Sequence, residues 1–215
     1  MKLKTMEQLQ DLIDAEFAWR KKELSILKSK IYIAKGKTID TEIRCGIALL
    51  YAHWEGFIKN SAQLYLEFVA NQRVKYCELA PSFIALKLKR KLTECEQTNK
   101  SSIHTQIIDF LINDLENTSQ IPFRNIINTE SNLSSLVLKE IVHTIGLDYT
   151  QFETKNKLID ERLLKNRNEI AHGEFNIVDK DDFDEIFTEI YNLMNLFKND
   201  ILNAAVQKKY LQQVV

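Results

Sequence analysis

The sequence predicts an all-α protein folded as an up-and-down helical bundle, and three observations carry that prediction. Five Gly and two Pro among 215 residues are too few for the many turns of a β-sandwich or barrel. Leu, Ile, Lys, Glu, Ala and Gln, which favour helix, are abundant. Apolar residues recur at helical spacing through much of the chain. Because 45% apolar composition is ample for a core, we expect residues 1–215 to form a single domain.

Two long helices are expected in the first third of the chain. Apolar residues recur at helical intervals from about residue 5 to residue 34, and Lys35–Lys37 interrupts the pattern. Thr38 or Asp40 can then cap a second helix that runs to about Arg73. The apolar residues of this second helix are spread so widely that we expect it to be buried on more than one side.

Residues of about 77 to 147 are interpreted as a helical elaboration inserted between the second helix and the later helices, and packed at one end of the bundle. Pro81-Ser82 is a typical helix start, and a further helix is expected over Ile103 to Leu115. The stretch 121–131 is rich in Asn, Ser and Thr, which predicts an irregular loop.

The last third of the chain predicts three further helices. One should begin at a cap provided by residue 131 or 132 and end near residue 145, before Gly146. Another should begin at residue 149 or 150 and run through residues 166–172. The last is expected after Asp179, because acidic residues there suit the positive end of a helix dipole and a continuous apolar face follows.

Charge and cysteine content exclude some classes of protein. The formal net charge is −1, so RNA contacts must come from local patches rather than from a polycationic surface. Three cysteines without a Cys-x-x-Cys pair fit a reducing cytosol. They are expected to be small buried residues. Neither a signal peptide nor an apolar stretch long enough for a membrane is recognised, so we expect a cytoplasmic protein with no membrane contact.

The most basic run of the chain falls on the third expected helix. Its members are Lys87, Lys89, Arg90 and Lys91. One interpretation is an ordinary solvated helix face, and the other is a surface that binds the phosphates of RNA.

The segment of residues 166–174 offers the best candidate chemistry. Arg167 keeps its proton and carries five fixed donors, while His172 has a side chain whose unperturbed pKa lies near neutrality. Arg can stabilise negative charge on a phosphoryl group, and neutral His can take a proton from a hydroxyl. Asn168 adds a neutral donor and acceptor beside them. These residue types indicate a phosphate site that needs no metal.

The spacing of Arg167 and His172 limits how they can meet. On an ideal helix, residues five positions apart lie roughly 140° apart around the axis, so the two side chains would point to different sides. A helix that ends at His172, with Gly173 after it, could loosen its last turn and bring the two together. Alternatively, two copies of the segment could meet across a two-fold axis.

The same residues also allow a purely structural interpretation. In it, Arg167 forms an ion pair with a nearby carboxylate such as Glu55. His172 is then a surface residue near a helix C-terminus, where positive charge is favoured.

Two segments carry a resemblance to a known family. Arg167-Asn168-x-x-x-His172, followed by Gly173 and placed between two long helices, resembles the Arg-x4-6-His motif of the HEPN superfamily, many members of which are metal-independent ribonucleases. Tyr51–Lys59 resembles the second-helix signature of stand-alone bacterial HEPN-type nucleases, in which that helix packs beside the motif. The resemblance implies supporting roles for His53, Glu55 and Lys59.

The resemblance covers most of the chain and implies a HEPN-like bundle, commonly a symmetric homodimer with both motifs in one cleft. The function it implies is a metal-independent endoribonuclease, a toxin or defence effector acting on RNA, with an antitoxin or defence-system partner. Glu174 stands where toxins silenced by adenylylation have Tyr, so control at that position is not expected. The alternative is a non-catalytic helical module that binds a nucleotide, RNA or a protein.

In the implied reaction, His172 removes a proton from the ribose 2′-OH, which attacks the adjacent phosphorus. Arg167 stabilises the charge that develops, and Asn168 orients the phosphate or His172. The products are a 2′,3′-cyclic phosphate and a 5′-OH. The four histidines are scattered and no His-Glu-x-x-His occurs, so neither a metal site nor a cofactor is predicted.

Overall fold

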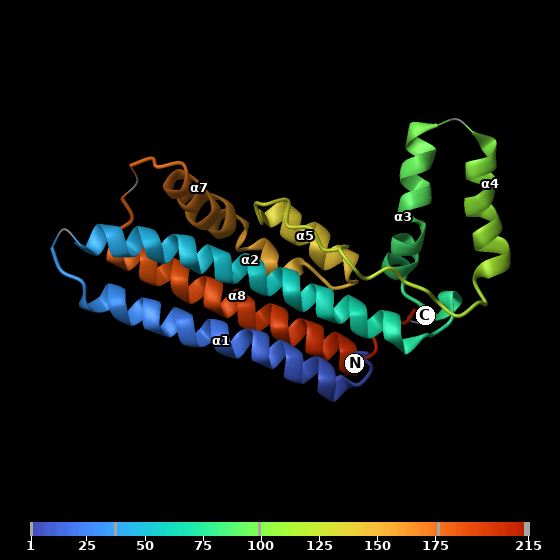
Figure 1. Cartoon of the computed structure of the whole chain (residues 1–215), viewed down its shortest axis with the longest axis horizontal. Coiled ribbons are helices and arrows are strands. Elements are labelled where there is room, and N and C mark those ends of the chain that lie inside the picture. Colours follow the sequence, from blue (N-terminus) through green and yellow to red (C-terminus); the bar gives the residue numbers. More distant parts are fainter. Residues whose placement is uncertain (1, 37, 99, 176, 213–215) are drawn as a thin grey trace.

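Three long helices form the body of the protein. A computed structural model describes residues 2–36, 38–98, 100–175 and 177–212. In it α1 (Met6–Ile33), α2 (Thr38–Gln72) and α8 (Lys180–Val206) pack against one another along their lengths (Figure 1). Within the described ranges, β-pairing is limited to two isolated bridges. The predicted all-α fold is therefore confirmed.

Local sequence explains where these helices begin. The Thr5 side chain accepts a hydrogen bond from the backbone N–H of Gln8, whose side chain accepts one from Thr5 in return, so a capping box starts α1. Asp179 caps α8 by accepting a hydrogen bond from the backbone N–H of Asp182 at 2.8 Å. Both caps lie where the sequence predicts a helix start.

The central helix α2 is buried on several sides, as its apolar pattern predicts. Gly46 lets it approach its neighbours closely. A Cβ atom at Gly46 would lie 2.6 Å from Ile31 Cδ1 of α1 and 3.0 Å from Phe183 Cε2 of α8. The first distance is shorter than real Cβ contacts and the second is tight, so a larger residue at Gly46 would force the end of the Ile31 side chain to move.

A helical hairpin projects from one end of the bundle (Figure 1). It consists of α3 (Pro81–Gln97), α4 (Ser101–Asp109) and the π-helical turn η2 (Phe110–Asp114) that continues α4. A short 3-10 turn, η1 (Tyr76–Glu78), joins α2 to this hairpin. The predicted helix starts at Pro81 and near residue 103 are thus close to the observed ones.

The rest of the predicted elaboration lies along the bundle and not at its end. α5 (Ser135–Thr144) begins two or three residues later than predicted, with Ser134 as its N-cap. Ser131 cannot cap it because its φ is +61°, a left-handed conformation. The backbone N–H of Leu133 donates to the Tyr51 hydroxyl at 2.6 Å, which holds this part of the chain beside the middle of α2.

The predicted helix through residues 166–172 is divided into three pieces. These are α6 (Thr150–Glu153), the π-helical η3 (Leu158–Leu164) and α7 (Lys165–Ala171). Gly173, with φ +76°, ends α7 as predicted. Its N–H donates to the Ile170 carbonyl at 3.1 Å, and the Glu174 N–H donates to the Glu169 carbonyl at 2.9 Å, which together form a Schellman turn.

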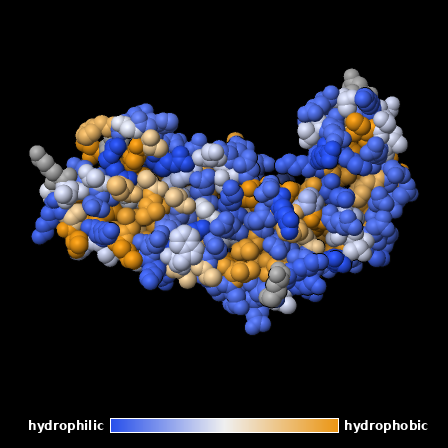
Figure 2. Space-filling view, viewed as in Figure 1, coloured by the Kyte–Doolittle hydropathy of each residue, from blue (hydrophilic) through white to orange (hydrophobic). Residues whose placement is uncertain are grey.

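Apolar side chains remain exposed at the end of the molecule that carries α7. Figure 2 shows apolar surface gathered there. Four large side chains at this end, which we call the apolar end, are Tyr32, Ile33, Phe175 and Ile177, with exposed fractions of 71%, 72%, 89% and 67%. The Lys180 ammonium donates to the Tyr32 carbonyl at 3.2 Å, so the end of α1 lies beside the start of α8.

Candidate functional site

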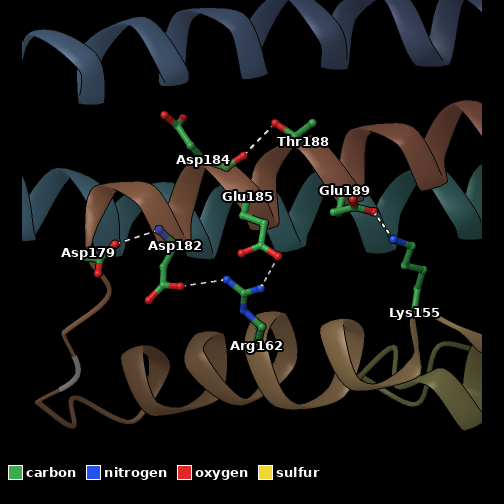
Figure 3. Close-up of polar contacts among 8 residues, drawn as sticks. All are labelled: Lys155, Arg162, Asp179, Asp182, Asp184, Glu185, Thr188 and Glu189. Atoms are coloured by element: carbon green, nitrogen blue, oxygen red, sulfur yellow. Dashed lines mark hydrogen bonds and ion pairs between the residues drawn. The ribbon is translucent and has the colours of Figure 1, made fainter.

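Ion pairs fix the segment that leads into α7 on the surface of α8 (Figure 3). The Arg162 guanidinium of η3 lies between two carboxylates, 2.9 Å from Asp182 and 2.9 Å from Glu185. Lys155 lies 2.6 Å from Glu189 one helical turn further along. The hydrogen bond and charge of Arg162 lower the pKa of the Glu185 carboxyl below its ordinary value. These contacts set the orientation of α7.

A second set of contacts joins η3 to the start of α5. One carboxylate oxygen of Asp160 accepts the backbone N–H of Ser135 at 2.7 Å, and the other accepts its hydroxyl at 2.5 Å. The Tyr149 hydroxyl donates to the Ser135 carbonyl at 3.0 Å. The loop before α5 is therefore held against the helices that position Arg167.

Arg167 is bound by this loop and by its own neighbour. Its Nη1 donates to Asn132 Oδ1 at 3.1 Å and to Asn168 Oδ1 at 2.6 Å. Its Nη2 donates to the Ser131 carbonyl at 3.0 Å. The guanidinium thus has a defined position, as a phosphate-binding group requires.

The α2 helix provides the other side of the Arg167 environment. The guanidinium carbon lies 4.0 Å from the centroid of the Tyr51 ring, and Nη2 lies 3.8 Å from Glu55 Oε2. Burial raises the pKa of Tyr51 to about 12, so its hydroxyl stays protonated at neutral pH. The ion pair of Arg167 with Glu55 is the contact expected from the sequence if Arg167 has a purely structural role.

His172 is exposed at the C-terminus of α7. Its backbone N–H donates to the Asn168 carbonyl at 2.9 Å, and the regular turn at Gly173 follows directly. Arg44 of α2 donates to the Glu174 carbonyl at 2.9 Å and anchors the chain after this turn. Arg167 faces α2 while His172 faces solvent, as their spacing on a regular helix predicts.

The side chains of the second-helix signature, Tyr51–Lys59 on α2, point in two directions. His53 is buried against α1, with Nε2 3.0 Å from Glu23 Oε2 and its ring 5.2 Å from that of Trp19. Burial lowers the pKa of His53. Glu55 faces Arg167, and Lys59 follows it by one turn on the same side, where it lines a pocket. Glu55 and Lys59 therefore lie on the Arg167 side of α2, whereas His53 lies on the α1 side.

The basic run lies far from Arg167. Its helix, α3, belongs to the hairpin at one end of the molecule, whereas α7 lies towards the other end (Figure 1). Arg90 forms an ion pair with Glu94 at 2.9 Å on the same helix. The run therefore does not border the candidate site directly.

Three residues that contact Arg167, namely Tyr51, Ser131 and Asn132, are not assigned to the site by the sequence alone. The sequence indicates Tyr51 only as part of the second-helix signature, and residue 131 or 132 only as a helix cap. Tyr51 could have been found, since it precedes Glu55 by four residues and therefore shares its helix face. No local signal predicts the Ser131 and Asn132 contacts, because they join positions 35 and 36 residues away from Arg167.

The geometry thus comprises a helical bundle, a fixed Arg167 and an exposed His172 on a helix that Gly173 ends. The chain belongs to the RiboL-PSP-HEPN family, whose model matches residues 15–203. That match includes both segments on which the resemblance rests, and the family indicates an RNA-related role. No curated protein and no solved structure matches the chain. Among the described residues, no helix is long and apolar enough to cross a membrane.

Proposed function

We propose that the protein is a metal-independent endoribonuclease. The observation that supports this most is Arg167, held by α2 and the loop before α5 and placed five residues before an exposed His in a HEPN-family chain. Because the guanidinium is already positioned, it can meet a phosphoryl group without further ordering.

In the proposed reaction, His172 accepts the proton of a ribose 2′-OH as the 2′-oxygen forms a bond to phosphorus. The bond from phosphorus to the 5′-oxygen breaks, and that oxygen takes a proton from an acid. Arg167 neutralises the added charge on the phosphoryl oxygens. Asn168 keeps the guanidinium in place, because its Oδ1 accepts a hydrogen bond from Arg167 Nη1 at 2.6 Å. The products are a 2′,3′-cyclic phosphate and a 5′-OH.

The active unit in this proposal is a homodimer. One copy has Arg167 and His172 on different sides of α7, so a second copy can bring its own His172 to the phosphate as the acid or the base. The apolar end adjoins His172, and each large apolar side chain that becomes buried stabilises association by about 1.5 to 3 kcal/mol. HEPN domains commonly work as dimers on RNA.

The proposed biological role is that of a cytoplasmic toxin or defence effector that an antitoxin or defence-system partner restrains. Its test is expression in a bacterial host. Wild-type protein should stop growth, while Arg167→Ala protein made at the same level should not. Equal tolerance of both would contradict the role.

The activity itself is tested by digestion of RNA in EDTA, with DNA and 2′-O-methyl RNA as controls. We expect cleavage of RNA alone, because only RNA has the attacking 2′-OH. Cleavage that needs Mg²⁺, or cleavage of the 2′-O-methyl strand, would refute the proposal.

One observation favours a second candidate, a non-catalytic module that binds RNA, a nucleotide or a protein. Arg167 already contacts Glu55, Ser131 and Asn132, so its guanidinium could serve the fold alone. If that is its role, neither wild-type nor His172→Ala protein should cleave RNA.

A further inference from the structure

A groove runs between α2 and the irregular segment of residues 119–128. It consists of two adjoining pockets of about 620 and 640 Å³, which share Glu67, Phe123 and Arg124 in their walls. The second pocket reaches α3 of the projecting hairpin. In Figure 2 the outline of the molecule is hollowed between the bundle and this hairpin.

The charge of this groove differs from that of the whole chain. Six cationic side chains line it, and the sole acidic residue among the described residues in its walls is Glu67. The net charge of the chain is −1, so cations are concentrated here. We call it the basic groove; its cations are Lys2, Lys59, Arg73, Lys87, Arg90 and Arg124.

Both walls of the basic groove lead to Arg167. On α2, Lys59 in the groove lies one turn from Glu55, which is 3.8 Å from Arg167. On the other wall, Asn128 lines the groove three residues before Ser131. The Ser131 carbonyl accepts a hydrogen bond from the Arg167 guanidinium. The groove therefore connects the candidate site with α3.

The irregular wall is held in place by hydrogen bonds. The Gln63 side chain of α2 donates to the Phe123 carbonyl. Further along, the Ser119 N–H donates to the Val74 carbonyl at 2.8 Å and the Gln120 N–H to the Tyr76 hydroxyl at 2.9 Å. A wall fixed at these points needs little ordering when a ligand binds.

We propose that the basic groove binds the single-stranded RNA that extends from the phosphate held by Arg167. The nature of the ligand rests on the proposed function. The cations would contact successive phosphates, and the half-buried Phe123 ring and the Asn and Gln side chains of the walls would contact bases. Cationic grooves with interspersed aromatic and polar side chains bind single strands in this way.

This proposal divides the basic run of α3 into two pairs. Lys87 and Arg90 line the groove, while Lys89 and Lys91 are not among its wall residues. The two pairs lie on the same helix, so they allow a comparison at equal change of net charge.

The binding test uses a labelled 2′-O-methyl RNA of about 16 nucleotides, the upper size of typical single-strand sites, because it resists cleavage. Fluorescence anisotropy would compare full-length wild type, the groove variant Lys87→Gln with Arg90→Gln, and the control Lys89→Gln with Lys91→Gln. The logarithm of the RNA-binding constant decreases linearly with the logarithm of the salt concentration. In the groove variant this slope should be shallower by about 1.4, which is about 0.7 for each phosphate that the variant no longer neutralises. The control should keep the wild-type slope.

A cleavage test separates this proposal from the proposed function. The groove variant should cut a dinucleotide as fast as the wild type and cut the long RNA several-fold more slowly. If wild-type protein cuts RNA but the groove variant equals the control in binding and cleavage, the groove proposal is overturned and the nuclease stands. If wild-type protein cuts nothing while the binding difference persists, the nuclease fails and the groove stands. Tighter, groove-dependent binding of polyglutamate than of RNA would assign the groove to an acidic protein instead.

Discussion

The Arg167 guanidinium carbon lies 4.0 Å from the centroid of the Tyr51 ring. The hydroxyl of the same ring accepts the backbone N–H of Leu133 at 2.6 Å. The buried Tyr51 side chain therefore contacts both Arg167 and the loop before α5. Arg167 itself also binds this loop, at the Ser131 carbonyl. This arrangement makes the position of Arg167 depend on α2.

Tyr51→Phe should destabilise the fold by about 1 to 3 kcal/mol, because the Leu133 N–H would remain buried without its acceptor. The ring under Arg167 would stay. Urea unfolding measures the change, and Tyr32→Phe, whose ring is 71% exposed, is the control. A loss no larger than that of the control would show that the hydroxyl contributes nothing.

Arg167→Lys should lower kcat/KM for RNA by about a hundredfold or more, a typical loss when a donor to a developing oxyanion is removed. Lysine keeps the charge but cannot make the forked contacts with Asn132, Asn168 and the Ser131 carbonyl. Steady-state cleavage rates would be measured beside circular dichroism spectra. Wild-type activity in the lysine variant would mean that charge alone suffices.

His53 should make the fold less stable in mild acid. Burial against α1 lowers its pKa below 6.5, so the folded protein binds this proton less readily than the unfolded chain. The free energy of unfolding is therefore unaffected by His53 above about pH 6.5 and falls as pH drops towards the lowered pKa. Denaturant unfolding between about pH 7 and pH 5 would detect this.

The matched variant for that measurement is His53→Gln, which removes the titration while keeping a polar side chain. Wild type should lose more stability over this range than His53→Gln does. Parallel stability curves for the two proteins would disprove the assignment.

Mixing Arg167→Ala with His172→Ala protein should restore cleavage above that of either variant alone, if one site takes Arg from one copy and His from the other. The proteins would be mixed under conditions that permit subunit exchange. The same mixture without exchange is the control. If light scattering showed that the fully active protein is a monomer at assay concentration, the shared site would be contradicted. The nuclease proposal would still stand.

The long helices could be predicted from sequence because their signals are local. The capping box at Thr5, the cap at Asp179 and the glycine at the end of α7 each act within a few residues. The pairing of Arg167 with Glu55 could be anticipated as well. It follows once the second-helix signature and the motif are placed side by side.

Long-range contacts account for what the sequence did not predict. The start of α5 depends on two such contacts. The Leu133 N–H donates to the Tyr51 hydroxyl, 82 residues earlier in the chain. The Ser135 N–H donates to the Asp160 carboxylate, 25 residues later. The expectation that the cysteines are buried was wrong, because Cys45 is exposed and Cys77 and Cys95 are only partly buried. Composition indicates average burial for a residue type, whereas the helix face at each position decides it.

The most direct test of the proposed nuclease is the chemistry of the RNA ends left by wild-type protein in EDTA. We predict 2′,3′-cyclic phosphate and 5′-OH termini, which mass spectrometry of the fragments would identify, and their loss in His172→Ala protein of unchanged fold. Fragments with 5′-phosphate ends, or the same fragments from the His172→Ala protein, would contradict this mechanism.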